Sequence, residues 1–274
     1  MSEFQTLAEQ IARAAGAVLK NRFHDVRTIE IKDGLSANLV TDADKASEAL
    51  ILEWLAREVP KHAVLAEERG AVGQGDYTWF VDPLDGTTNY AHAVPHFCVT
   101  LALQGPAGLL AGVSYDPIRD ELFSAGLGEG ATLNGRPLRA SRVTRLEDAI
   151  LGTGFPYDLQ ERPHLPLGLF TRLAMKAQGM RRMGSAALDF AYVAAGRLDG
   201  FFELGLKPWD TAAGALLISE AGGQLRRIDG AAYEPRFGDV LAAGPGVLQE
   251  LTVICASFVE GAGWKPRPFS LKIR

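Results

Sequence analysis

Three separated segments of the chain place acidic side chains at the edge of an apolar run. These acids are Glu67 and Glu68, Asp82 and Asp85, and Asp210. Magnesium prefers carboxylate oxygens, and it usually binds through a few carboxylates together with the phosphate of a substrate. If the fold brings these segments together, the chain can hold divalent cations beside a phosphate group.

The pattern around the first aspartates predicts how they are positioned. Residues 79–81, Trp-Phe-Val, favour a buried strand, and Pro83 stops strand pairing directly after Asp82. The chain then turns at Gly86, and the Thr-Thr-Asn sequence of residues 87–89 is typical of a helix start. Free backbone N–H groups at a helix start favour an anion, so a phosphate group suits this position.

Capping is the competing interpretation of the same acids. Asp82 alone could cap a turn, and Asp85 and Asp210 could each cap a helix. Overturning that interpretation needs more acids in similar positions, and Glu67 and Glu68 supply them. The set as a whole therefore favours metal binding.

Taken together, the motifs resemble those of the inositol monophosphatase family of Mg2+-dependent, lithium-sensitive phosphatases, and the segments 181–189 and 202–210 look most similar to those of bacterial inositol-1-monophosphatases. The motifs are Glu-Glu at 67–68, Asp-Pro-Leu-Asp-Gly-Thr-Thr-Asn at 82–89, Trp-Asp-Thr-Ala-Ala-Gly at 209–214 and Glu-Ala-Gly-Gly at 220–223. The resemblance spans most of the chain. It implies a layered α/β fold, an alternating αβαβα sandwich of the inositol monophosphatase and fructose-1,6-bisphosphatase type, with the metal site between two halves.

The chain reads as two α/β halves of one compact unit, with no visible linker. Residues 1–140 form the N-terminal half with most metal ligands, and residues 141–274 form the C-terminal half with Asp210 and the substrate pocket. Periodicity and turn signals predict the elements of both halves. Helices are expected at 3–22, 44–58, 165–178, 185–195, 210–221 and 246–260. Strands are expected at 63–66, 78–82, 96–103, 109–115, 149–153, 199–203, 224–228 and 239–243.

Carried over residue by residue, the resemblance implies a role for each site residue. The ligands of two to three Mg2+ ions are implied to be Glu67, Asp82, Asp85, Asp210 and the backbone carbonyl of Leu84. Thr87 and Glu67 are implied to orient and deprotonate the attacking water, with Asp44 as their supporting partner. The substrate-binding residues are implied to be Asp85, Gly86, Thr87, Gly184, Ser185, Ala186, Glu203 and Asp210.

The implied reaction is the hydrolysis of inositol 1-phosphate to myo-inositol and phosphate by direct attack of a metal-activated water. Glu203 matches the family position that contacts inositol hydroxyls. The substrate stays open, because relatives hydrolyse fructose 1,6-bisphosphate, histidinol phosphate or phosphoadenosine phosphate. Some bacterial members also act as protein-binding components of transcription complexes, so a protein partner is a second hypothesis. Family members are usually homodimers, which implies a homodimer here.

Composition agrees with a globular enzyme. At 274 residues and 47% hydrophobic, the chain can bury a large core, and its net charge of −5 argues against a nucleic-acid backbone as the primary partner. The two cysteines, Cys98 and Cys255, lie in apolar runs, which indicates no disulfide framework and a cytoplasmic protein. Residues 1–20 read as an amphipathic helix and not a signal peptide, and no membrane span is expected.

Other catalytic motifs match less well. Asp42-Ala43-Asp44 superficially resembles the motif of phosphatases that form an aspartyl-phosphate, but residues 41–48 read better as a capped helix start. His92 and His96 are separated by Pro95, which argues against a shared helical face and a zinc pair. The sequence has no P-loop lysine motif, no Gly-x-Ser-x-Gly elbow and no Cys-x5-Arg motif.

Overall fold

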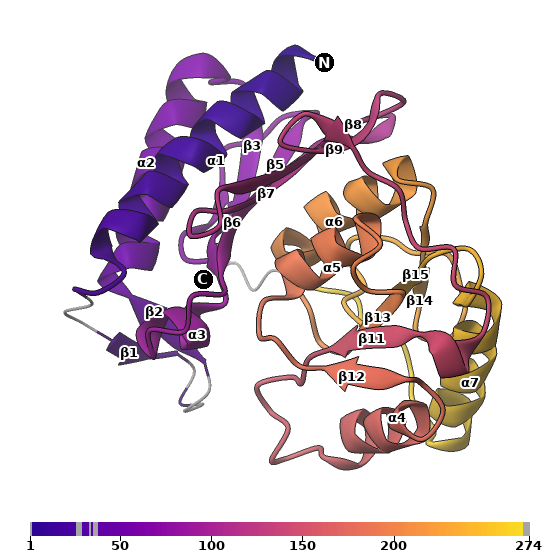
Figure 1. Cartoon of the computed structure of the whole chain (residues 1–274). Coiled ribbons are helices and arrows are strands. Elements are labelled where there is room, and N and C mark those ends of the chain that lie inside the picture. Colours follow the sequence, from indigo (N-terminus) through magenta and orange to yellow (C-terminus); the bar gives the residue numbers. More distant parts are fainter. Residues whose placement is uncertain (1, 26–28, 33, 35–37, 271–274) are drawn as a thin grey trace.

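The structure is a computed structural model and describes residues 2–25, 29–32, 34 and 38–270. In this part of the chain, helices and sheets alternate in five layers (Figure 1). The outer helices α1 (Glu3–Arg22) and α2 (Asp42–Glu58) cover one face of a large sheet. Helices α5 (Ala186–Ala194) and α6 (Pro208–Glu220) lie between this sheet and a smaller one, which α4 (His164–Ala174) and α7 (Leu248–Gly261) cover from outside. The expected αβαβα sandwich is confirmed.

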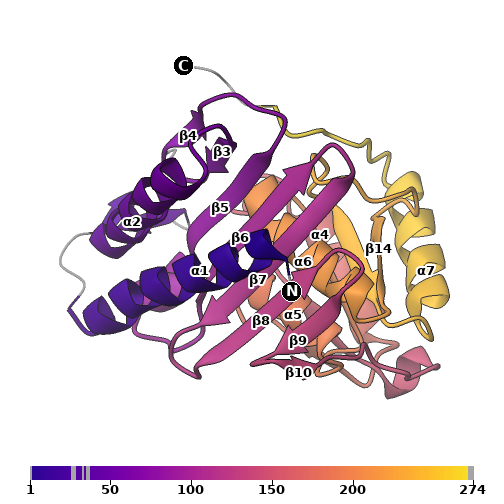
Figure 2. The same ribbon diagram turned by 90° about the horizontal axis from the view of Figure 1, so that it is seen from above.

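The large sheet has eight strands in the described residues, and Figure 2 looks onto it through α1 and α2. In spatial order they are β10 (Arg136–Pro137), β9 (Gly130–Leu133), β8 (Glu121–Gly126), β7 (Gly108–Asp116), β6 (Cys98–Gly105), β5 (Thr78–Asp85), β3 (Ala63–Ala66) and β4 (Gly70–Val72). All neighbours are antiparallel except β3 and β5, which run parallel. The carboxyl ends of β3 and β5 therefore lie side by side.

The smaller sheet has five strands in the part of the chain that the structure describes. In spatial order they are β12 (Gly179–Arg181), β11 (Ile150–Thr153), β13 (Gly200–Glu203), β15 (Val240–Ala243) and β14 (Gln224–Arg227). Strand β11 is parallel to both of its neighbours. The remaining elements are the ribbon β1 (Ile29–Ile31) and β2 (Leu39–Thr41), the short helix α3 (Thr87–Ala91) and the 3-10 turn η1 (Leu146–Asp148).

The two inner helices explain why the sandwich is tightly layered. Every residue of α6 from Thr211 to Ile218 is buried, as expected for a helix with a sheet on either side. An added Cβ on Gly112 of β7 would lie 3.0 Å from the Cα of Ala213, so α6 rests directly on the large sheet. A Cβ on Gly214 would overlap Phe190 of α5. Glycines at these contacts therefore set the position of α6.

The structure corrects some predicted boundaries. The strand predicted at 78–82 continues to Asp85, because pairing resumes after Pro83 with a shifted register: Asp82 faces Thr100, whereas Asp85 faces Cys98. The helix predicted at 165–178 ends at Ala174, and the next residues lead into the unpredicted strand β12. None of the helices in the described residues has the length and hydropathy to span a bilayer.

Candidate active site

Acids from three elements converge at one end of the large sheet. Glu67 directly follows β3, and its backbone N–H donates to the carbonyl of Val81 on the parallel strand β5 at 3.1 Å. This bond brings Glu67 next to Asp82, and the first turn of α6 supplies Asp210. Burial raises the pKa of Asp82 well above its usual value, and the charges of the three other acids in this cluster raise it further. The four acids, Glu67, Asp82, Asp85 and Asp210, therefore repel one another.

One carboxylate oxygen of each aspartate in the cluster accepts a hydrogen bond from a backbone N–H group. Asp82 accepts the N–H of Leu84 at 3.0 Å, Asp210 accepts the N–H of Lys207 at 2.7 Å, and Asp85 accepts that of Ala187 at 2.9 Å. The first bond closes a turn, and the other two satisfy the starts of α6 and α5. The capping interpretation thus describes one oxygen of each carboxylate and leaves the other outside these bonds.

Thr87 and Asp44, predicted to assist the attacking water, lie together behind the acids. The hydroxyl of Thr87 is 2.9 Å from the carbonyl of Leu84 and 3.1 Å from Oδ1 of Asp44. The other oxygen of Asp44 accepts the backbone N–H of Thr41 at 2.8 Å and its hydroxyl at 2.5 Å. Burial raises the pKa of Asp44 to about 6, although the bonds from Thr41 oppose the shift. Gly86 turns the chain into α3 with a φ of +93°.

A lysine from the β1–β2 ribbon reaches the same end of the sheet. The ammonium of Lys32 lies 3.0 Å from Oε1 of Glu67 and also pairs with Glu68. Burial disfavours the charge of Lys32, but the two carboxylates outweigh it and raise its pKa. Burial and the charge of Glu67 raise the pKa of Glu68 to about 7. Glu48 accepts the backbone N–H of Glu68 at 2.9 Å and so fixes the loop after β3.

The predicted substrate residues of the C-terminal half face this cluster. Gly184 lies opposite Gly86, since a Cβ on Gly86 would be 3.3 Å from the carbonyl oxygen of Gly184. Ser185 begins α5 and donates its hydroxyl to Asp85, and Ala186 is the first helical residue. Glu203 ends β13, where Gly154 leaves room for its carboxylate. Burial raises the pKa of Glu203 to about 8, against the opposing charge of Arg182.

Two residues at the site had no motif to mark them. Tyr157, in the loop after β11, is 54% exposed as a whole residue. Partial burial and the charges of the clustered acids raise the pKa of its hydroxyl, so the hydroxyl stays protonated. Asp189, one helical turn after Ser185, is buried, and its Oδ1 has no hydrogen-bond partner among the described residues. Its place on the same face of α5 as Ser185 was the one available signal.

The donor set suits a hard divalent cation in its chemistry and charge. It consists of carboxylate oxygens and the carbonyl of Leu84, which are the ligand types that magnesium prefers. Burial raises the pKa of Asp210 well above its usual value, and the negative charge of Glu67 raises it further. A bound cation would relieve the repulsion between these two carboxylates. As the side chains of the described residues stand, no three acids, histidines or cysteines are placed to hold one ion.

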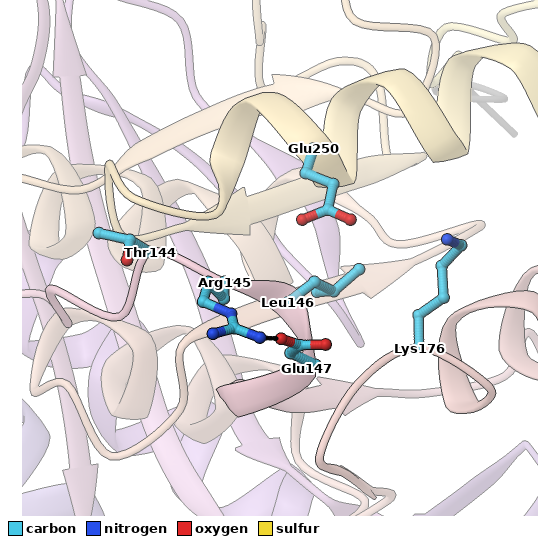
Figure 3. A pocket seen from close by; sticks show the side chains of 6 residues that line it. All are labelled: Thr144, Arg145, Leu146, Glu147, Lys176 and Glu250. Atoms are coloured by element: carbon cyan, nitrogen blue, oxygen red, sulfur yellow. Dashed lines mark ion pairs between the residues drawn. The ribbon is translucent and has the colours of Figure 1, made fainter.

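A separate cavity of about 380 Å3 lies in the C-terminal half (Figure 3). Side chains of both charges line it, from η1 and the two residues before it, from the segment after α4, and from α7. They are Thr144, Arg145, Leu146, Glu147, Lys176 and Glu250. Arg145 and Glu147 form an ion pair within the lining. The cavity draws on different segments from the acid cluster.

Known proteins share both the sequence and the fold. The inositol monophosphatase family matches residues 1–260. The Nus factor SuhB of Salmonella typhimurium is 42% identical over 253 residues, which cover 92% of this chain and 95% of the relative. The inositol-1-monophosphatase of Synechocystis is 42% identical over 261 residues, covering 93% and 91%. The solved inositol monophosphatase of Anabaena (Nostoc) has a TM-score of 0.85 at 41% identity, covering 95% of this chain and 98% of that chain.

Proposed function

Since the chain belongs to the inositol monophosphatase family of phosphatases, we propose that it is a Mg2+-dependent hydrolase of inositol 1-phosphate. The observation that carries this proposal is the convergence of four acids, of which Asp82 is buried and the other three are partly buried, beside the Thr87–Asp44 pair. A phosphate monoester repels a negatively charged nucleophile, so its hydrolysis needs positive charge held close to the phosphate. A cluster of carboxylates is the means by which a protein gathers such cations.

The residues that would hold two to three Mg2+ ions are Glu67, Asp82, Asp85, Asp210 and the carbonyl of Leu84. When bound, the ions supply positive charge against the phosphate and lower the pKa of a water molecule. Asp82, Asp85 and Asp210 each have one oxygen engaged with the backbone, which limits their rotation. The chain thereby orients the remaining oxygens before any ion arrives.

We propose that Thr87 and Glu67 hold the attacking water. Asp44 and the carbonyl of Leu84 share the single hydroxyl hydrogen of Thr87, so the lone pairs of the Thr87 oxygen can accept a hydrogen bond from water. Glu67 accepts the proton of that water as the new P–O bond forms. The P–O bond to the alcohol breaks in the same direct displacement, its electron pair stays on the departing oxygen, and that oxygen takes up a proton from solvent water. Gly86 and Thr87 contact the phosphate.

The test of this proposal is phosphate release from a set of candidate substrates in the presence of Mg2+. The set is inositol 1-phosphate, fructose 1,6-bisphosphate, histidinol phosphate and phosphoadenosine phosphate. We expect the highest kcat/KM for inositol 1-phosphate, no release in excess chelator, and inhibition by lithium, since one of several cations should be exchangeable. Full activity in chelator would refute the metal requirement. A higher kcat/KM for another ester would keep the reaction and replace the substrate.

Substrate selectivity should depend on Glu203, which ends β13 and is close enough to Asp85 and Asp210 for their charges to interact. Glu203→Ala is expected to weaken the use of inositol 1-phosphate by about 1 to 3 kcal/mol, because hydrogen bonds to the polyol are lost. Glycerol phosphate offers fewer hydroxyls and should be hydrolysed nearly as well as by the wild type. The measurement is kcat/KM for both esters, with Glu203→Gln as the control that keeps hydrogen bonding. An equal loss on both esters, or a changed Mg2+ requirement, would assign Glu203 to the metal site instead.

A protein partner is a second candidate function. Several relatives at 39–44% identity carry the name Nus factor SuhB, which supports a transcription-associated role alongside catalysis. Affinity capture with wild type and with Asp82→Asn separates the two functions. A partner retained by the Asp82→Asn variant would act independently of phosphate chemistry.

We also propose a homodimer, as the family resemblance implies, and light scattering of the purified chain tests it.

A further inference from the structure

One oxygen of Asp85 collects donors from both halves of the molecule. The hydroxyl of Ser185 and the backbone N–H of Ala187 both donate to Oδ2 of Asp85, the latter at 2.9 Å. The thiol of Cys98 lies 3.9 Å from the same oxygen. Asp85 and Cys98 belong to the large sheet, whereas Ser185 and Ala187 begin α5. A single carboxylate oxygen thus joins the sheet to the inner helix layer.

Neighbouring contacts fix this junction on either side. The side-chain amide of Asn89 donates to the carbonyl of Met183 at 2.9 Å and to that of His96 at 2.8 Å. The positive φ values of Gly86 and Gly184, +93° and +92°, let the two turns face each other closely. The segments before α3 and α5 are therefore locked together around Asp85.

The hydroxyl of Ser185 has little capacity left for a substrate. Ser185 is 1% exposed, gives its only hydroxyl hydrogen to Asp85, and accepts the backbone N–H of Leu188 at 3.4 Å as the N-cap of α5. A polyol would meet the backbone of Gly184 to Ala186 more readily than this side chain. The bonds of Ser185 point to Asp85 as the group on which it acts.

We propose that Ser185 is a positioning residue for the metal ligand Asp85, holding Oδ2 so that Oδ1 faces the cations. This inference rests on the proposed function, because it takes Asp85 as a ligand. A ligand that is already oriented loses less freedom when it binds an ion, and partners that orient metal ligands typically contribute about 10- to 100-fold in metal affinity. The helix start adds a favourable partial charge for the carboxylate. The C-terminal half thereby sets part of the cation affinity of the N-terminal half.

The experiment measures Mn2+ binding to the full chain by calorimetry, without substrate. Ser185→Ala is expected to weaken Mn2+ binding by about 10- to 100-fold, and Ser185→Thr, which keeps a hydroxyl, should bind within a few-fold of the wild type. Ser257→Ala on α7 is the matched control, because its hydroxyl bonds only to its own helix. Cys98→Ala should cause a smaller loss, and it replaces Ser185→Ala if that variant does not fold.

Kinetics with two esters separates positioning from substrate contact. If Ser185 positions Asp85, Ser185→Ala loses activity equally on inositol 1-phosphate and glycerol phosphate, and excess Mg2+ restores both. Unchanged Mn2+ affinity together with a loss confined to inositol 1-phosphate would overturn the inference and assign Ser185 to the substrate. Tight Mn2+ binding by a wild type that releases no phosphate from any ester would instead refute the proposed function and leave the Ser185 comparison readable.

Discussion

Asp82→Asn and Asp210→Asn are each expected to lower turnover by about 10^3-fold while the chain stays folded. Each substitution removes one negative charge that would hold a cation against the phosphate. The fold should survive because an amide oxygen still accepts the backbone N–H of Leu84 or Lys207, as the carboxylate does. The measurement is kcat for inositol 1-phosphate at saturating Mg2+, combined with a thermal denaturation curve.

Asp229→Asn provides the matched control for these variants. Asp229 pairs with Arg227 in the turn after β14, away from the acid cluster, so its loss should leave kcat near the wild-type value. Turnover within a factor of about ten of wild type for Asp82→Asn would mean that this acid only caps a turn, since a charge in the transition state is worth more. The capping interpretation would then account for both carboxylate oxygens of Asp82.

The metal-free protein should lose thermal stability as pH rises from 6.5 to 8.5. A carboxyl group whose pKa is higher in the folded than in the unfolded chain stabilises the fold only while it is protonated, so that stability is lost as pH rises towards the folded pKa. Burial raises the pKa of Glu203 to about 8 and that of Glu68 to about 7, and it raises those of Asp82 and Asp210 well above their usual values. The loss should be on the order of 2 to 4 kcal/mol, or a Tm decrease of roughly 5 to 10 °C.

Two controls assign this pH dependence to the site. Burial lowers the pKa values of His62 and His96, which moves the titration of these two histidines further below the chosen window. Glu203→Gln cannot ionise and should flatten the upper part of the curve, and saturating Mg2+ should flatten the rest by favouring the anionic acids. A metal-free Tm that is constant or rises over this window would show that the acids are ionised without strain and do not repel one another.

Local patterns in the sequence predict the alternation of helices and strands and the acids at the ends of apolar runs, whereas the order of the layers comes from the family resemblance. An amphipathic first helix and a strand ending in Asp-Pro-x-Asp can be read directly, and the structure brings Glu67, Asp82, Asp85 and Asp210 together. The continuation of β5 beyond Pro83 could not be read, because it depends on pairing with Cys98 of another strand.

Contacts between distant segments were out of reach for the same reason. The charges of the clustered acids act on the hydroxyl of Tyr157, which lies more than 60 positions from Asp85 in the sequence. Lys32 pairs with Glu67 and Glu68 across 35 and 36 positions of the sequence. No spacing rule foresees which oxygen of Asp85 would be bonded to Ser185, 100 positions away. These details depend on how the layers meet, and local propensity carries no information about that.

The close packing of α6 against Gly112 offers a way to abolish activity without changing any acid. Asp82 and Asp85 lie on β5 and Glu67 directly follows β3, whereas Asp210 lies on α6. The close contact at Gly112 and the side chains packed between the two layers fix the distance between these acids. An added methyl group at Gly112 would push α6, and with it Asp210, away from the large sheet while leaving every charged group intact. Activity could then be lost although no acid had been changed. The spacing between layers is thus as much a part of the catalyst as the carboxylates themselves.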